Sequence, residues 1–184
     1  MKINWSGRAH KFSKADIKYL VEIIKNADPM TQGSYLKKFQ KNFSEYIGKK
    51  NVFALSSAAS ALEIIAALLK IKKNDEIIIP AHTYCASAIP FARNGAKLVW
   101  ADINFSSRTI DLNDFKKKVT KKTKAVIIVH LYGYAVDFKN IINFCKKKNI
   151  KIIEDCAQSL GAEINGKKVG ILGDFSCYSF HAQK

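Results

Sequence analysis

Arginine is scarce in a chain that is otherwise strongly basic. The 184 residues carry 31 lysines and arginines against 15 acidic residues, a formal net charge of +16, yet the only arginines are Arg8, Arg93 and Arg108. Proteins that read base edges or clamp nucleic-acid phosphates favour arginine, and no helix-turn-helix, zinc-finger or RNP pattern accompanies the lysines. We therefore expect no specific nucleic-acid partner. The lysines, in short runs such as 116–118, are interpreted as a solvated surface that also attracts anionic substrates.

Long apolar segments are missing as well. A bilayer span needs about 18 apolar residues, and the best candidate is interrupted by Glu63, Lys70, Asn74 and Asp75. The first eight residues contain no apolar stretch of the kind found in secretion signals. From these absences we expect a cytoplasmic protein with no membrane partner.

Motifs that bind metals or nucleoside triphosphates are absent too. The four cysteines, at positions 85, 145, 156 and 177, have spacings that fit neither a metal clip nor a disulfide framework, so we expect reduced thiols and no metal site. Gly161–Lys167 satisfies G-x-x-x-x-G-K, but Lys168 stands where a phosphate loop has serine or threonine, and Asn165-Gly166 predicts a hairpin turn. The motifs G-x-G-x-x-G, H-E-x-x-H and G-x-S-x-G do not occur either.

Short apolar runs that alternate with helical stretches are the main feature that is present. The runs are Val52–Leu55, Glu76–Ile79, Leu98–Ala101, Ala125–His130 and Ile150–Glu154. Helical spacing occupies about 58–71, 83–93, 111–118 and 137–147. Strands and helices in this order indicate right-handed crossovers and a mainly parallel sheet covered on both faces, a three-layer α/β fold.

Two amphipathic helices precede this alternation. Ser13 followed by Asp16 predicts a helix start, and apolar residues then recur at helical spacing to about Asn26. A second helix carries its apolar residues on one side from Leu36 to Ile47 and stops at Gly48. We expect a helical segment over residues 1–33 and one large domain over 34–184.

Four strand ends carry residues suited to ligands, which gather at the carboxyl ends of parallel strands. The small residues from Ser56 to Leu62 would let a phosphate approach the start of a helix, although serine caps open many helices that bind nothing. Between Pro80 and Ser87, Tyr84 offers a flat ring for stacking, or is a structural tyrosine.

The other two strand ends carry charge. Glu154 and Asp155 close an apolar strand, which favours a buried cationic partner over the alternatives of a helix cap or a salt bridge to a lysine. Lys184 follows small and aromatic residues, an environment that makes an amine nucleophilic toward carbonyl groups. A lysine at such a position is otherwise simply solvated.

Together these segments resemble the sugar aminotransferases of the DegT/DnrJ/StrS family, fold type I pyridoxal-phosphate enzymes. The resemblance rests on Glu154–Ser159, Gly173-Asp174 and Ser179–Lys184, with further similarity in Thr31–Gly33, Pro80–Tyr84 and His130–Gly133 in the same order. It spans about Asp28 to Lys184. The resemblance implies an aspartate-aminotransferase-like large domain, pyridoxal 5'-phosphate as cofactor, and transfer of an amino group, usually from glutamate, to a nucleotide-linked keto sugar in amino-sugar and polysaccharide biosynthesis.

The resemblance also implies a role for each site residue. Lys184 would form the covalent link to the cofactor aldehyde and shuttle a proton, and Asp155 would pair with the protonated ring nitrogen. Gln158 would lie at the ring hydroxyl and Tyr84 on the ring face. The phosphate would be held by Ser57, Ala58, Ala59 and Ser179. Because dehydratase relatives have histidine where this chain has Lys184, transamination is favoured.

Two departures from the family pattern leave alternatives open. Ala58-Ala59 stands where relatives have a threonine hydroxyl, which Ser57 or Ser60 would have to replace. Relatives are about twice as long, so we expect a partial chain or an isolated large domain that binds cofactor poorly by itself. A dehydratase and a catalytically silent regulatory or binding relative are the alternatives, and a homodimer is expected by analogy.

Overall fold

The computed structural model describes residues 11–181, which fall into two compact units. One unit includes the described residues up to Ala54, and the other runs from Leu55 to Phe180. In the part of the chain that is described, no helix has both the length and the apolar character needed to cross a membrane.

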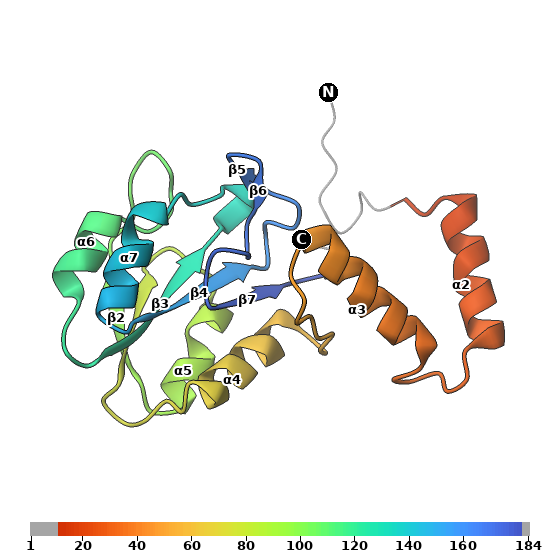
Figure 1. Cartoon of the computed structure of the whole chain (residues 1–184), viewed down its shortest axis with the longest axis horizontal. Helices are drawn as coiled ribbons and strands as arrows, with labels where there is room; N and C mark the ends of the chain where they lie inside the picture. The colour runs from red at the N-terminus through yellow and green to blue at the C-terminus, as the bar shows by residue number, and fades with distance from the viewer. Residues whose placement is uncertain (1–10, 182–184) are drawn as a thin grey trace. The chain divides into compact units, whose positions relative to one another are not determined.

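The first unit contains the two expected helices, α2 (Lys14–Asn26) and α3 (Ser34–Ile47) (Figure 1). Ser13 and Asp16 form a reciprocal capping box, with the Asp16 amide donating to Ser13 Oγ at 3.1 Å and Asp16 accepting from the Ser13 amide at 2.8 Å. Gly48 ends α3 with φ of 72°, a left-handed conformation that glycine adopts at low cost. Both helix predictions are confirmed.

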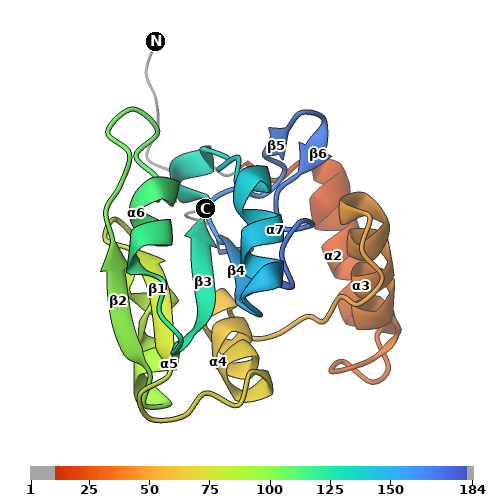
Figure 2. The ribbon, with the colours of Figure 1, turned by 60° about the vertical axis from the view of Figure 1, so that its left-hand side comes forward.

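The second unit is built on a five-stranded parallel sheet of order β2-β1-β3-β4-β7. Its strands are β1 (Glu76–Pro80), β2 (Lys97–Ala101), β3 (Thr123–Val129), β4 (Lys151–Cys156) and β7 (Phe175–Tyr178). Its helices are α4 (Ala58–Leu68), α5 (Ile89–Arg93), α6 (Leu112–Lys118) and α7 (Lys139–Lys147), with short 3-10 turns at Cys85–Ser87 and Leu131–Gly133. This arrangement confirms the predicted α/β class (Figure 2).

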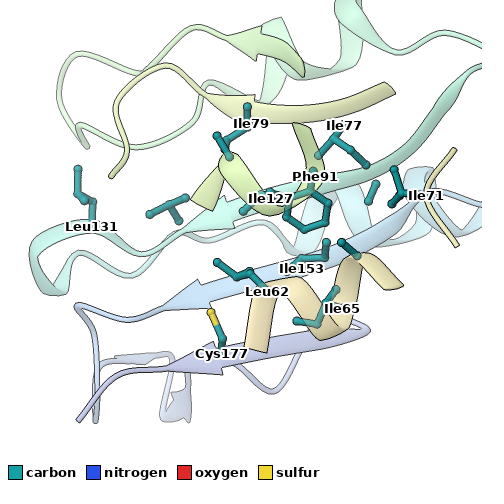
Figure 3. Packing of buried hydrophobic residues seen from close by; sticks show 14 residues of the cluster. Leu62, Ile65, Ile71, Ile77, Ile79, Phe91, Ile127, Leu131, Ile153 and Cys177 are labelled. Atoms are coloured by element: carbon teal, nitrogen blue, oxygen red, sulfur yellow. The ribbon is translucent and has the colours of Figure 1, made fainter. Parts of the chain in front are cut away.

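Alternating residues of each central strand point to opposite faces of the sheet, and each face has its own apolar core. One face buries Ile77, Ile127 and Ile153 beneath α4 and α5 (Figure 3). The other buries Ile78, Ile128 and Ile152 beneath α6 and α7. Strands buried on both faces read as continuous apolar runs, which explains why the sequence pattern located them.

The strand expected at Val52–Leu55 is wrong, because these residues form an irregular connection. Phe53 is 75% exposed, and the Ala54 amide donates to the side chain of Gln40 at 3.2 Å instead of to a neighbouring strand. An apolar run forms a strand only where another strand is available to pair with it.

The helix expected over 83–93 is divided into the 3-10 turn Cys85–Ser87 and α5, because Pro90 lacks the N–H that a continuous helix would use. The predicted hairpin is confirmed: β5 (Glu163–Ile164) pairs antiparallel with β6 (Lys167–Lys168) around Asn165-Gly166. Both turn residues have positive φ, as a two-residue hairpin requires. The hairpin lies in the connection between β4 and β7, which contains no helix.

Candidate active site

The carboxyl ends of β1, β3, β4 and β7 lie at one edge of the sheet, since these strands are parallel neighbours. Asp155 belongs to the end of β4, while Tyr84 follows β1. Gln158 follows β4 and Ser179 follows β7. The topology therefore explains why residues so far apart in sequence belong to one edge.

Glu154 and Asp155 are neighbours on β4 but face opposite sides of the sheet. Glu154 shares its side with the core beneath α6 and α7, and Asp155 shares its side with the core beneath α4 and α5. Both carboxylates are buried, Glu154 at 0% and Asp155 at 6% exposure. The two carboxylates differ in the hydrogen-bond donors that surround them.

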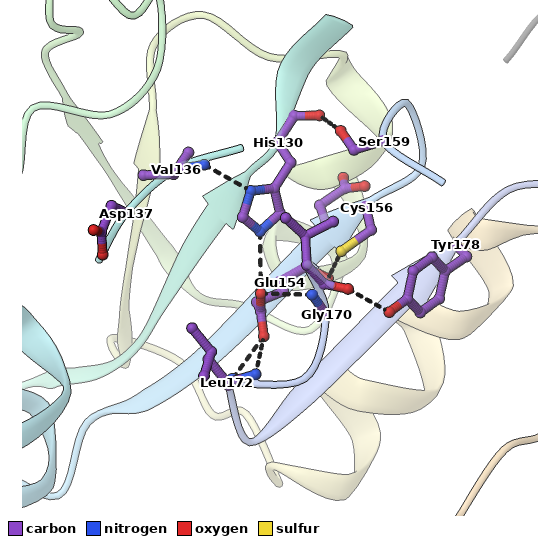
Figure 4. Close-up of polar contacts among 12 residues, drawn as sticks. His130, Val136, Asp137, Glu154, Cys156, Ser159, Gly170, Leu172 and Tyr178 are labelled. Atoms are coloured by element: carbon purple, nitrogen blue, oxygen red, sulfur yellow. Dashed lines mark hydrogen bonds and ion pairs between the residues drawn. The ribbon is translucent and has the colours of Figure 1, made fainter. Parts of the chain in front are cut away.

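Glu154 is enclosed by donors from two parts of the chain, the loop Gly170–Gly173 and His130 (Figure 4). Its Oε1 accepts from the amides of Leu172 at 2.8 Å and Gly173 at 2.6 Å, and its Oε2 accepts from the amide of Gly170 at 2.7 Å. His130 Nε2 lies 3.1 Å from the same Oε2. Gly170 has φ of 87°, and a β-carbon there would overlap the hydroxyl of Tyr178, so glycine is required for this approach.

The protonation of this pair follows from its partners. The Val136 amide donates to His130 Nδ1 at 3.0 Å, so Nδ1 is the unprotonated nitrogen and Nε2 carries the proton that it donates to Glu154. Burial alone would raise the pKa of Glu154, but the hydrogen bonds from His130, Gly173 and Gly170 outweigh it, and the pKa is lowered. Glu154 is therefore an ionised carboxylate, and both of its oxygens accept hydrogen bonds from within the protein.

His130, Glu154 and Cys156 have ligand atoms within 4.8 Å of one another, the only such buried group among residues 11–181. The proton on His130 Nε2 occupies the position a metal would take. Burial also raises the pKa of the Cys156 thiol well above its ordinary value. The donor chemistry is that of a closed hydrogen-bond network.

Among the described residues, the donors hydrogen-bonded to Asp155 are neutral. Ser87 Oγ donates to Oδ2 at 2.6 Å and the Ala157 amide donates to Oδ1 at 3.0 Å, while the Cys177 thiol lies 3.7 Å from Oδ1. None of the ion pairs found in the described part of the chain includes Asp155. A buried carboxylate without a cation is costly, so this position fits a positively charged ligand.

Gln158 is bound to the loop that follows β3. The Tyr132 amide donates to Gln158 Oε1 at 3.1 Å, which leaves the side-chain NH2 of Gln158 as the group able to donate to a ligand. In the same region, Ser159 Oγ donates to the His130 carbonyl, and the His130 amide donates to the Asp155 carbonyl at 3.0 Å. These bonds fix the ends of β3 and β4 relative to one another.

The start of α4 is the predicted phosphate turn. Ser57 is its N-cap, with Oγ accepting from the Ser60 amide at 3.0 Å. Ser60 Oγ lies 2.8 Å from Ser56 Oγ and 3.0 Å from Ser57 Oγ. Three hydroxyls therefore gather at the beginning of a helix whose first turn also contains Ala58 and Ala59, where partial positive charge favours anions.

The other predicted site residues are Tyr84, Ser179 and Lys184. Tyr84 is 64% exposed, so its ring is accessible for stacking. Ser179 is half-buried directly after β7. Lys184 lies outside the described residues. Sequence reasoning assigned no role to Ser87 or His130, although a polar residue within an apolar turn and a histidine directly after a buried strand were available signals.

Comparison with known proteins gives a consistent result. The model of the DegT/DnrJ/EryC1/StrS aminotransferase family matches residues 11–184. GDP-perosamine synthase of Vibrio cholerae is 38% identical over 167 residues, covering 91% of this chain and 46% of that protein. dTDP-3-amino-3,6-dideoxy-alpha-D-galactopyranose transaminase of Aneurinibacillus thermoaerophilus is 39% identical over 148 residues, covering 80% of this chain and 41% of that protein.

A solved structure agrees with these relatives. The putative sugar aminotransferase Spr1654 of Streptococcus pneumoniae, in its PLP form, superposes with a TM-score of 0.87 at 29% identity, covering 95% of this chain and 48% of that one. The present chain thus spans less than half the length of the relatives it matches.

Proposed function

The chain belongs to the DegT/DnrJ/EryC1/StrS aminotransferase family, and we propose that it forms the cofactor-binding part of a pyridoxal-phosphate-dependent enzyme that moves an amino group onto a nucleotide-linked keto sugar. The observation that carries the proposal is the Asp155 carboxylate, which is buried among neutral donors. The protonated pyridine nitrogen of the cofactor is a cation that such a carboxylate stabilises. The names of the relatives, a GDP-perosamine synthase and a dTDP-amino-sugar transaminase, support the sugar substrate.

The donor set fits the cofactor group by group. Asp155 would hold the ring nitrogen, and the free NH2 of Gln158 would meet the ring hydroxyl. The exposed ring of Tyr84 would cover one face. The phosphate would bind at the start of α4, and the aldehyde would bond to Lys184. The phosphate-binding residues in this proposal are Ser57, Ala58, Ala59 and Ser179.

When bound, the cofactor supplies an electron-accepting ring for the electrons released as the substrate carbon–hydrogen bond breaks. Asp155 keeps a proton on the ring nitrogen, because a buried anion favours a cation beside it. Tyr84 excludes water from the ring face that it covers. Once the incoming amino group has displaced it from the cofactor aldehyde, the Lys184 amine would take up the proton from the substrate carbon as a general base and deliver it to the cofactor C4′ as a general acid.

Several finer points belong to the same proposal. Glutamate is proposed as the amino donor and a homodimer as the working form. The cytoplasm is proposed as the location, since the named relatives act on nucleotide-linked sugars. Residues 34–184 are proposed as the cofactor-binding domain, preceded by a helical segment over 1–33.

The test is covalent capture of the cofactor followed by product analysis. The protein is incubated with pyridoxal phosphate and reduced with borohydride, and the peptides are examined by mass spectrometry. We expect the adduct on Lys184, and absence of any adduct in the full-length protein would reject the proposal. In a separate sample that is not reduced, a nucleotide-linked keto sugar and glutamate should yield an amino sugar. A deoxy sugar would instead show a dehydratase, and salt-sensitive DNA binding without cofactor uptake would show a regulator.

A further inference from the structure

Ser87 is a buried hydroxyl on the same side of the sheet as Asp155. It closes the 3-10 turn Cys85–Ser87 after β1 and is 1% exposed. Its Oγ donates to Asp155 Oδ2 at 2.6 Å, across 68 residues of sequence. A hydrogen bond to an ionised carboxylate is stronger than one between neutral groups.

A second hydroxyl, that of Thr83, is hydrogen-bonded to Ser87. Thr83 Oγ1 lies 2.9 Å from Ser87 Oγ. The single hydroxyl proton of Ser87 is used on Asp155, because a carboxylate can only accept. Thr83 is therefore the donor in this second bond, and its contact to the Tyr84 carbonyl is the longer one, at 3.5 Å. The result is a directed relay from Thr83 to Ser87 to Asp155.

The relay joins two residues that are proposed to touch the same ring. Thr83 directly precedes Tyr84, whose ring is exposed, and Asp155 is at the end of a strand two positions away in the sheet. Ser87 fixes Oδ2 and the Ala157 amide fixes Oδ1, so the plane of the carboxylate is set from both oxygens. Without Ser87 the carboxylate could rotate about its bond to the β-carbon.

We propose that Ser87 is a positioning residue that orients Asp155 toward the ring nitrogen of the cofactor, with Thr83 orienting Ser87 in turn. This inference rests on the proposed function. Its effect is specific to one atom of the ligand. The loss of Ser87 should therefore weaken binding only for ligands that carry a protonated ring nitrogen.

The experiment compares two ligands and four variants. Dissociation constants are measured by equilibrium dialysis for pyridoxal 5'-phosphate and for its analogue with C–H in place of the ring nitrogen. Ser87→Ala should weaken binding of pyridoxal phosphate by roughly tenfold, the scale of one hydrogen bond to a charged group, and leave the analogue unchanged. Ser87→Thr, which keeps the hydroxyl, should restore binding to within about twofold.

Two further variants complete the test. Thr83→Val should weaken binding in the same ligand-specific way by about threefold, because it removes only the outer bond of the relay. Thr83→Val also carries the test if Ser87→Ala fails to fold. The control is Thr123→Val, which removes a buried hydroxyl at the opposite end of the sheet, where Thr123 accepts from the Thr120 amide. It should change neither dissociation constant.

The outcomes separate this inference from the proposed function. Equal weakening of both ligands in Ser87→Ala and Thr83→Val would show a merely structural hydroxyl and overturn the role of Ser87 alone. Unchanged binding of both ligands would overturn it equally. If the unaltered full-length protein binds neither ligand, or shows no preference for the ring nitrogen, the proposed function fails and this inference fails with it.

Discussion

The two faces of the sheet treat adjacent carboxylates in different ways. Glu154 is met by three main-chain amides and an imidazole N–H, and its pKa is lowered. Asp155, one residue later, is met by one main-chain amide, a serine hydroxyl and a thiol. The first carboxylate holds a loop in place and has its charge balanced by fixed donors. The second is buried among neutral donors, which is why we propose it, and not Glu154, as the acid that pairs with a cationic ligand.

Replacing each acid by its amide is the most direct way to test this contrast. Glu154→Gln should lower the free energy of unfolding by about 3 to 5 kcal/mol, because an NH2 group then faces main-chain donors in a buried site. Urea unfolding measures this change. Glu76→Gln is the matched control, since that buried glutamate contacts Thr120 and the exposed Lys97 at the other end of the sheet and should cost clearly less.

Asp155→Asn should give the opposite combination of effects. The free energy of unfolding should change by less than about 1 kcal/mol, because the neutral amide avoids the cost of a buried charge. Binding of pyridoxal phosphate should fall by about 100-fold, the scale of a lost buried charge pair. Fluorescence titration measures the binding. If the stability loss matched that of Glu154→Gln, the two faces would not differ as described.

The pH dependence of stability should also distinguish the faces. The folded-state pKa of Glu154 is below its ordinary value of 4.5, so its contribution is complete above that value and is lost as pH falls through the folded pKa. The gap in unfolding free energy between the unaltered protein and Glu154→Gln should therefore be constant from pH 7 to about pH 5 and shrink at lower pH. A gap that grew on acidification would contradict the assignment of Glu154 as the ionised partner.

The smallest effect is expected at a helix cap. Ser57→Ala and Ser13→Ala each remove an N-cap hydroxyl bond and should each cost about 1 kcal/mol in unfolding free energy. Only Ser57→Ala should also weaken pyridoxal phosphate binding, because Ser57 begins α4 at the proposed phosphate turn. Equal binding by the two variants would remove Ser57 from the site.

Strands β1 to β4 and both N-terminal helices could be predicted from sequence because their signals are local, whereas β7 was not among the predicted strands. Periodicity, the Ser13 cap and Gly48 at the end of α3 each act within a few residues. The strand predicted at Val52–Leu55 was wrong, because an apolar run forms a strand only if a segment distant in sequence pairs with it. The difference between the environments of Glu154 and Asp155 could not be predicted from the sequence either. The sequence does not distinguish two adjacent acids, because their hydrogen-bond partners come from distant segments: Gly170 for Glu154 and Ser87 for Asp155.

The attachment of the β5–β6 hairpin has a practical consequence. The connection is fastened at its base by main-chain amides at Gly170, Leu172 and Gly173, while the tip at Asn165-Gly166 takes no part in these bonds. A short peptide tag or fluorophore-binding insert at the tip should therefore leave the carboxyl edge of the sheet undisturbed. The hairpin tip is therefore a site at which the protein can be labelled without changing the surroundings of Glu154 or Asp155.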